Sequence, residues 1–131
     1  MAKAIGIGGV FLDFKGDLNQ VMNWYEKYLK LDMTSYGTGF TEGTQLILLS
    51  FKRSGEENEP LLNIRVDDCD EMIKLLKGVG VKIIQEVTTY PYGKFARFLD
   101  PFGNPIELWE VYEDAYKEMV QSEVKAYKNK E

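Results

Sequence analysis

The chain contains no histidine and a single cysteine among its 131 residues. Without histidine it lacks the residue that enzymes most often use as a general base near neutral pH, and also the commonest metal ligand. The lone Cys69 cannot form a disulfide within the chain. Three aspartates within two positions of Cys69 should raise its pKa through repulsion of the thiolate. We therefore interpret Cys69 as a bystander thiol and expect no nucleophilic role for it.

Long apolar segments are also missing. No stretch approaches the roughly 20 apolar residues that a membrane-spanning helix needs, and the N-terminus has no apolar core of the signal-peptide type. We therefore expect no membrane partner and a cytoplasmic location. A net charge of −5 with dispersed basic residues also disfavours nucleic acid as a partner.

The residues that are present predict one α+β domain over 1–131. Hydrophobic residues make up 44% of the chain, which is enough to bury roughly two thirds of the unfolded surface. Alternation of apolar and polar residues predicts strands, and apolar residues three and four apart predict helices. In order, we expect a strand through Val10, Leu12 and Phe14, a helix capped by Asp17, strands over 31–37 and 45–51, then a strand over 61–66, a helix over 68–78 and strands over 82–87, 94–99 and 105–110.

The second half of the chain repeats the pattern of the first. Sliding the sequence by fifty residues pairs Leu12 with Leu62, Phe14 with Ile64, Asp17 with Asp67 and Met22 with Met72. We therefore expect two βαβββ modules, over about 5–53 and 61–111, joined by a polar linker over 54–60. An amphipathic helix over about 112–128 follows the second module.

The segment 98–110 carries the most specific motif. Its turn, Asp100-Pro-Phe-Gly-Asn104, predicts a hairpin that leads into an alternating strand. Together with Asp17-Leu18, Trp24-Tyr25 and Leu29-Lys-Leu31, it resembles the vicinal-oxygen-chelate superfamily, which includes glyoxalase I, extradiol dioxygenases, fosfomycin resistance enzymes and bleomycin-binding proteins. The resemblance implies a cupped mixed sheet that encloses a ligand cavity.

The metal site implied by this resemblance is not matched. The superfamily usually binds a divalent metal with two histidines and two glutamates, and only Glu107 falls on such a position. The other three positions fall within Gly9 to Phe11, at Leu61 or its neighbours, and at Ile47, where no residue offers a metal ligand. We therefore expect no metal and no cofactor.

Strand alternation divides the side chains between a helix-facing core and the cup. The apolar set, including Val10, Leu12, Phe14, Ile106 and Leu108, should face the helices. Two tyrosines in the loop over 86–94 should flank the mouth of the cup. The predicted ligand-binding residues are Phe11, Ile47, Leu49, Asn63, Arg65, Tyr90, Tyr92, Arg97, Glu107 and Trp109.

A carboxylate at Glu107 needs a partner if it is buried, and either Arg65 or Arg97 can supply one. Such a pair can simply close the cavity floor. Alternatively, it can present a hydrogen-bonding edge to a ligand whose apolar body lies on the aromatic side chains.

Three functions are compatible with this pattern. The first is metal-independent binding of a small molecule, for sequestration or sensing, as in the bleomycin-binding proteins. The second is a lyase, isomerase or dioxygenase-like enzyme that uses Glu107 as its base or in a weak metal site. The third is an interaction module without a ligand. In each case, similarity to small members of the superfamily and the apolar stripe of the C-terminal helix predict a homodimer.

Overall fold

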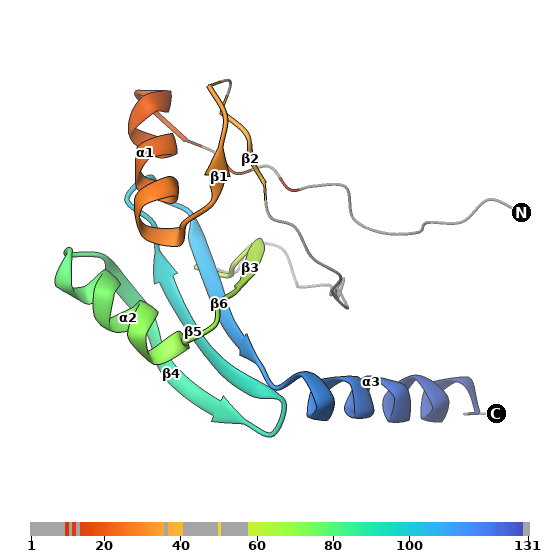
Figure 1. Cartoon of the computed structure of the whole chain (residues 1–131). Coiled ribbons are helices and arrows are strands. Elements are labelled where there is room, and N and C mark those ends of the chain that lie inside the picture. The colour runs from red at the N-terminus through yellow and green to blue at the C-terminus, as the bar shows by residue number, and fades with distance from the viewer. Residues whose placement is uncertain are drawn as a thin grey trace, which may run out of the picture. The chain divides into compact units, whose positions relative to one another are not determined.

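The structure is a computed structural model that describes residues 10, 12, 14–35, 37–40, 50 and 58–129. The chain divides into two compact units (Figure 1). The first comprises residues 1–57 and 102–104, and the second comprises 58–101 and 105–131. Among the residues described, no helix is both long enough and apolar enough to span a bilayer.

The first unit contains one helix and a short pair of strands. Helix α1 spans Leu18–Leu29, and the Asp17 carboxylate caps it by accepting a hydrogen bond from the backbone N–H of Asn19 at 2.9 Å, as predicted. Lys30 ends the helix in the left-handed conformation, with φ of 58°. Strands β1 (Asp32–Met33) and β2 (Gly39–Phe40) then pair antiparallel.

Aromatic packing holds the buried face of α1. Tyr25 is buried, and the Trp24 ring lies edge-on to it with the centroids 5.0 Å apart. Trp24 also contacts the Phe102 ring at 6.4 Å. Both aromatic residues of α1 therefore take part in packing within the first unit.

The expected first strand is not formed at the residues that the structure describes. Val10, Leu12 and Phe14 have no strand pairing, and Val10 and Phe14 are exposed where the alternation predicted a core. A strand requires a hydrogen-bonded neighbour. The strand expected over 45–51 lies outside the described residues except for Ser50, so the first βαβββ module stays a prediction.

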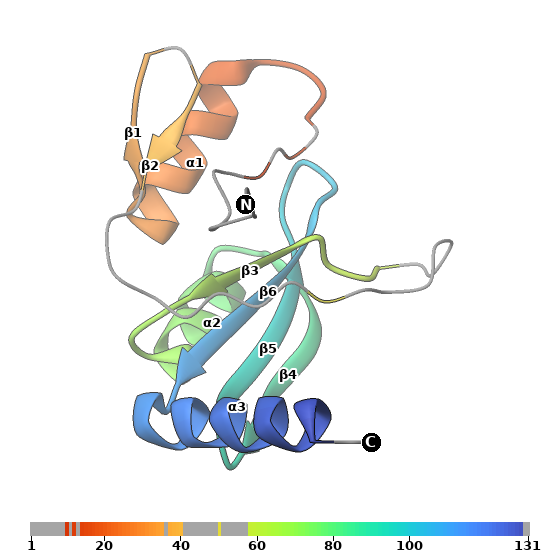
Figure 2. The same cartoon turned by 90° about the vertical axis from the view of Figure 1, so that its right-hand side faces the viewer.

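The second unit has the predicted βαβββ order. It comprises β3 (Leu62–Arg65), α2 (Cys69–Gly78), β4 (Lys82–Tyr90), β5 (Gly93–Leu99) and β6 (Pro105–Val111). The sheet order is β3-β6-β5-β4, with β3 parallel to β6 and the other pairs antiparallel. Helix α3 (Glu113–Lys128) follows β6 and begins close to the end of that strand (Figure 2).

The predicted hairpin joins β5 to β6. Leu99 pairs with Pro105, and the turn between them places Gly103 at φ of 94°, a conformation that glycine adopts without strain. Asp100, the first residue of this turn, is buried. The hairpin fixes the register of every side chain on β5 against its partner on β6.

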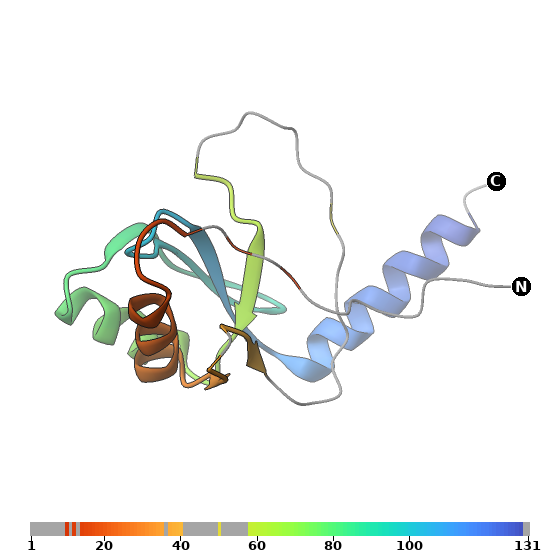
Figure 3. The same ribbon diagram turned by 90° about the horizontal axis from the view of Figure 1, so that it is seen from above.

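Helix α2 packs against one face of the sheet, and the first turn of α3 contacts the other face. The Cys69 backbone at the start of α2 donates to the Glu110 carboxylate, and Asp70 on α2 pairs with Lys94 on β5. Tyr116 of α3 instead packs on Trp109, which points to the other face. Beyond this first contact α3 leads away from the sheet (Figure 3).

Candidate functional site

A polar row crosses the sheet face opposite α2. The register places Asn63 of β3 opposite Glu107 of β6, and Glu107 opposite Arg97 of β5. Because paired residues point to the same face, the three side chains meet. The sequence predicted all three as ligand-binding residues, and the structure brings them together.

Both carboxylate oxygens of Glu107 accept a hydrogen bond. Asn63 Nδ2 donates to Oε1 at 2.9 Å, and Arg97 Nε donates to Oε2 at 2.9 Å. The side chains of Glu107 and Arg97 are 18% and 28% exposed, so water reaches this row only in part. Arg97 Nη1 also lies 3.7 Å from the Glu59 carboxylate. Arg97, and not Arg65, is therefore the arginine that pairs with Glu107.

An aromatic group lies next to this row on the same face. Phe95 of β5 stacks on Trp109 of β6 with centroids 5.1 Å apart, and Tyr116 of α3 meets Trp109 edge-on at 4.6 Å. The Arg65 guanidinium lies over Trp109 at 5.1 Å and forms an ion pair with Glu113 of α3 at 2.8 Å. Arg65 and Tyr116 thus tie the start of α3 to the sheet.

The two loop tyrosines extend the aromatic group. Tyr90 and Tyr92 stack with centroids 5.7 Å apart, and each ring meets Phe95 edge-on, also at 5.7 Å. They therefore form a continuous aromatic surface with Phe95 at the β4–β5 turn. Tyr90 is an exposed member of this surface.

Trp109 forms the floor of the aromatic group. It is only 2% exposed, and its indole Nε1 is buried without a hydrogen-bond partner among the described residues. Its ring edge rests on Gly93, where a Cβ atom would clash with Nε1 and with the Glu110 carbonyl oxygen. Trp109 lies on the same face as the polar row, and Tyr116 and Arg65 cover it, so its predicted contact with a ligand stays a prediction.

The donors around Glu107 do not fit a resident divalent metal ion. Its neighbours are an amide nitrogen and a guanidinium, and neither group is a metal ligand. In the part of the chain that the structure describes, no three His, Cys, Asp or Glu side chains form a group that could hold a metal. The expected ligand positions from Gly9 to Phe11 and at Ile47 lie almost wholly outside this part.

Cys69 takes no part in the candidate site. It is fully buried on the α2 side, and burial is the main cause that raises its pKa to about 11, followed by repulsion from Asp70 and Glu110. A thiol with so high a pKa is a poor nucleophile near neutral pH. The direction of the shift agrees with the sequence analysis, although desolvation outweighs the aspartates.

Sequence reasoning found part of this face and missed the rest. It named Asn63, Arg97 and Glu107 of the polar row, Tyr90, Tyr92 and Trp109 of the aromatic group, and Arg65, which lies over Trp109. Phe11, Ile47 and Leu49 lie outside the described residues. It missed Phe95, which shares strand parity with Arg97 and could have been found from it. It also missed Glu59, Glu113 and Tyr116, whose contacts depend on how the linker and α3 meet the sheet.

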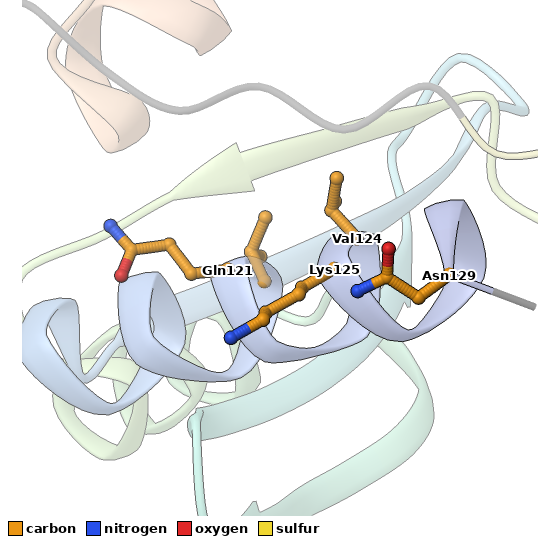
Figure 4. Close-up of a pocket in the computed structure, with 5 residues that line it drawn as sticks. Gln121, Val124, Lys125 and Asn129 are labelled. Atoms are coloured by element: carbon orange, nitrogen blue, oxygen red, sulfur yellow. The ribbon is translucent and has the colours of Figure 1, made fainter.

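A separate shallow groove lies along α3. Val120 and Val124 form its apolar part, and Gln121, Lys125 and Asn129 form its polar part (Figure 4). The groove is distinct from the polar row and the aromatic group. Val124 and Tyr127 are 46% and 75% exposed, so the apolar stripe of α3 is only partly covered by its own chain.

Residues 12–108 match the family described as the Glyoxalase/Bleomycin resistance protein/Dioxygenase superfamily. Among solved structures, TnmS3, an antibiotic binding protein from Streptomyces sp. CB03234, is 23% identical over 84% of this chain and 99% of that chain, with a TM-score of 0.56. A glyoxalase/bleomycin resistance protein from the same strain is 24% identical over 72% of this chain and 92% of that one, with a TM-score of 0.51. These two likenesses show the fold.

A third solved structure, UcmS2, matches only locally. It is 27% identical over 39% of this chain and 38% of its own length, with a TM-score of 0.37. The comparison with curated proteins gave no match. The matched family segment ends before α3, so α3 lies beyond it.

Proposed function

Because the chain belongs to the glyoxalase/bleomycin resistance protein/dioxygenase superfamily, we propose that it binds a small flat molecule on the sheet face opposite α2, without a metal ion. The observation that carries this proposal is the juxtaposition, on one face, of the polar row at Glu107 with the aromatic group at Phe95. A few fixed polar groups beside an aromatic surface are the usual composition of a ligand site.

Two further points support binding as the function. TnmS3, which shares the fold, is an antibiotic binding protein. In addition, both oxygens of Glu107 are engaged by donors, so the carboxylate is held as a fixed acceptor, which disfavours a role as general base. Sequestration or sensing of the ligand is the activity that we propose.

We propose a cytoplasmic homodimer as the working form. The buried free thiol of Cys69 suits a reducing compartment. The exposed Val124 and Tyr127 on α3 offer an apolar surface that a second copy can cover. Light scattering should give about twice the chain mass of 15.1 kDa. Val124→Glu should then lower the mass more than Ser122→Glu, which adds the same charge at another exposed position of α3; a monomeric wild type would refute the homodimer.

Calorimetric titration with a panel of flat neutral and cationic aromatic molecules tests binding directly. At least one should bind the wild type, and Asn63→Ala should weaken it because the row loses a donor that holds Glu107. Lys77→Ala is the matched control, since Lys77 forms an exposed ion pair with Glu86 away from this face. Failure of the whole panel, or equal effects of both substitutions, would contradict the proposal.

A further inference from the structure

We propose that the Arg97 guanidinium is the resident cation of this site and that it binds a neutral carbonyl or hydroxyl oxygen of the ligand. The second part, in which Arg97 binds a ligand oxygen, is called the ligand step and rests on the proposed function. The first part, in which Arg97 is the cation beside Glu107, does not rest on it. Arg97 thus takes the part that a divalent metal ion has in metal-dependent members of the superfamily.

The geometry fixes this cation. The β5–β6 register holds Arg97 opposite Glu107, and Nε donates to Oε2 at 2.9 Å. Asn63 occupies the other oxygen from β3. A metal ion would have to displace both donors from Glu107 and would then lie beside a guanidinium of the same sign. The carboxylate therefore selects the arginine over a metal ion.

Arg97 keeps donors for a ligand. A guanidinium has five N–H groups, of which Nε–H is taken by Glu107, while Nη1 faces Glu59 at the longer distance of 3.7 Å. Glu59 and Glu107 together outweigh the single charge of Arg97, so a strongly anionic chelating ligand is disfavoured here. A neutral oxygen acceptor fits the remaining N–H groups.

The aromatic group sets the body of such a ligand. Phe95 lies two residues from Arg97 on the same strand and the same face, and Tyr90 and Tyr92 continue its surface. A flat ring system on these side chains can direct an oxygen on its edge toward Arg97. The ligand class is therefore a flat aromatic compound with a carbonyl or hydroxyl group at its rim.

Cobalt titration followed by visible absorption tests the cation without any ligand. Wild type should not bind Co²⁺. Asn63→His combined with Arg97→His should bind one equivalent, roughly a hundredfold tighter than the control variant below, because two imidazoles then join Glu107. Adding Glu107→Gln should remove this binding. The control is Asn63→His with Lys94→His. Lys94 lies on β5, like Arg97, but points to the α2 face, so this variant should not bind Co²⁺.

Two results of this titration would overturn the inference. One is stoichiometric Co²⁺ binding by the wild type that Glu107→Gln abolishes, because Glu107 would then prefer a metal to Arg97. The other is a folded double-histidine variant, verified by circular dichroism, that binds no better than the control. The wild-type titration stands even if the variants do not fold.

A pair of matched probes tests the ligand step. 2-Aminomethylfluorenone and 2-aminomethylfluorene carry the same positive charge and differ only at C9, which is a carbonyl in the first and a methylene in the second. Wild type should prefer the fluorenone by about tenfold, as expected for a hydrogen bond from a charged donor. Arg97→Met should abolish the preference, and Arg97→Lys should keep part of it. An undiminished preference in Arg97→Met would overturn the ligand step; binding of neither probe would count against the proposed function and leave the cobalt result to decide the cation.

Discussion

The two faces of the four-stranded sheet are built from the same strands and differ in polarity and in how completely they are buried. Facing α2, Ala96, Phe98, Ile106 and Leu108 are completely buried. On the other face, the side chains of the polar row are partly exposed and bind one another. Arg65 on this face is also partly exposed and forms an ion pair with Glu113. Alternation along β5 and β6 therefore lets one short hairpin supply both a buried core and a partly exposed polar face, on which we propose that the ligand binds and which we call the recognition face.

This contrast indicates where the stability of the unit resides and predicts that substitutions on the two faces will differ in cost. Packing on the α2 face gains free energy from area removed from water, so its substitutions should be costly. On the opposite face, part of the area consists of polar groups that form hydrogen bonds and ion pairs with other side chains. Substitutions at four residues test the comparison: Phe98 and Cys69 on the α2 side, and Trp109 and Glu107 on the opposite face.

The largest effect is expected for Phe98→Ala on the α2 face. Phe98 is fully buried, and truncation leaves a cavity that the surrounding strands cannot fill, at a cost of about 4 kcal/mol. Urea unfolding followed by circular dichroism measures it. A loss below about 1 kcal/mol would mean that this face is not the core of the unit.

Trp109→Ala should cost slightly less, about 3 kcal/mol, although the residue lies on the recognition face. Its indole is covered by Tyr116, Phe95 and Arg65, so the loss also releases the start of α3. Trp109→Phe is the control and should retain most of the packing. If Trp109→Ala is nearly neutral in the same urea experiment, the cover over Trp109 is not formed in solution.

Glu107→Ala should destabilise by about 2 kcal/mol, because Arg97 and Asn63 lose their shared acceptor in a site that water reaches only in part. Glu107→Gln should be milder, since its amide oxygen still accepts one hydrogen bond. Differential calorimetry of both variants orders them. Equal losses for Ala and Gln would show that the charge, and not the acceptor, holds the row together.

The smallest effect concerns Cys69 and depends on pH. Its pKa rises from 9.0 in the unfolded chain to about 11 in the fold, so the unfolded state loses its proton first as pH rises. The stabilisation of the fold by the protonated Cys69 thiol is fully present below pH 9 and is lost as the pH rises toward 11. Between pH 8 and 10 the wild type should therefore lose about 1 kcal/mol relative to Cys69→Ala, measured by urea unfolding. Parallel pH profiles for the two proteins would contradict this.

Strand alternation in the sequence was enough to predict which side chains of β6 share a face. Period-two alternation on β6 correctly placed Glu107 and Trp109 together and Ile106 and Leu108 behind them. It left open whether Arg65 or Arg97 pairs with Glu107, because both have the right parity. Only the register decides: Arg65 lies opposite Trp109, one pleat further along the strand.

Contacts from outside the sheet could not be predicted in this way. The helical spacing of α3 correctly indicated an amphipathic helix, but a helix pattern does not say where its first turn docks. Tyr116 over Trp109 and Glu113 beside Arg65 depend on the bend at Tyr112, where β6 ends. The strand expected at Val10 to Phe14 shows the converse limit, since alternation alone does not provide a neighbouring strand.

The chain's two tryptophans fall one in each unit, Trp24 in the first and Trp109 in the second. Each unit therefore carries its own intrinsic fluorophore. Single-tryptophan proteins made by Trp24→Phe or Trp109→Phe would let the emission of each unit be followed alone during unfolding. Coincident transitions would mean that the tandem halves fold as one cooperative block, and separate transitions would make the second unit an independently folding scaffold for its recognition face.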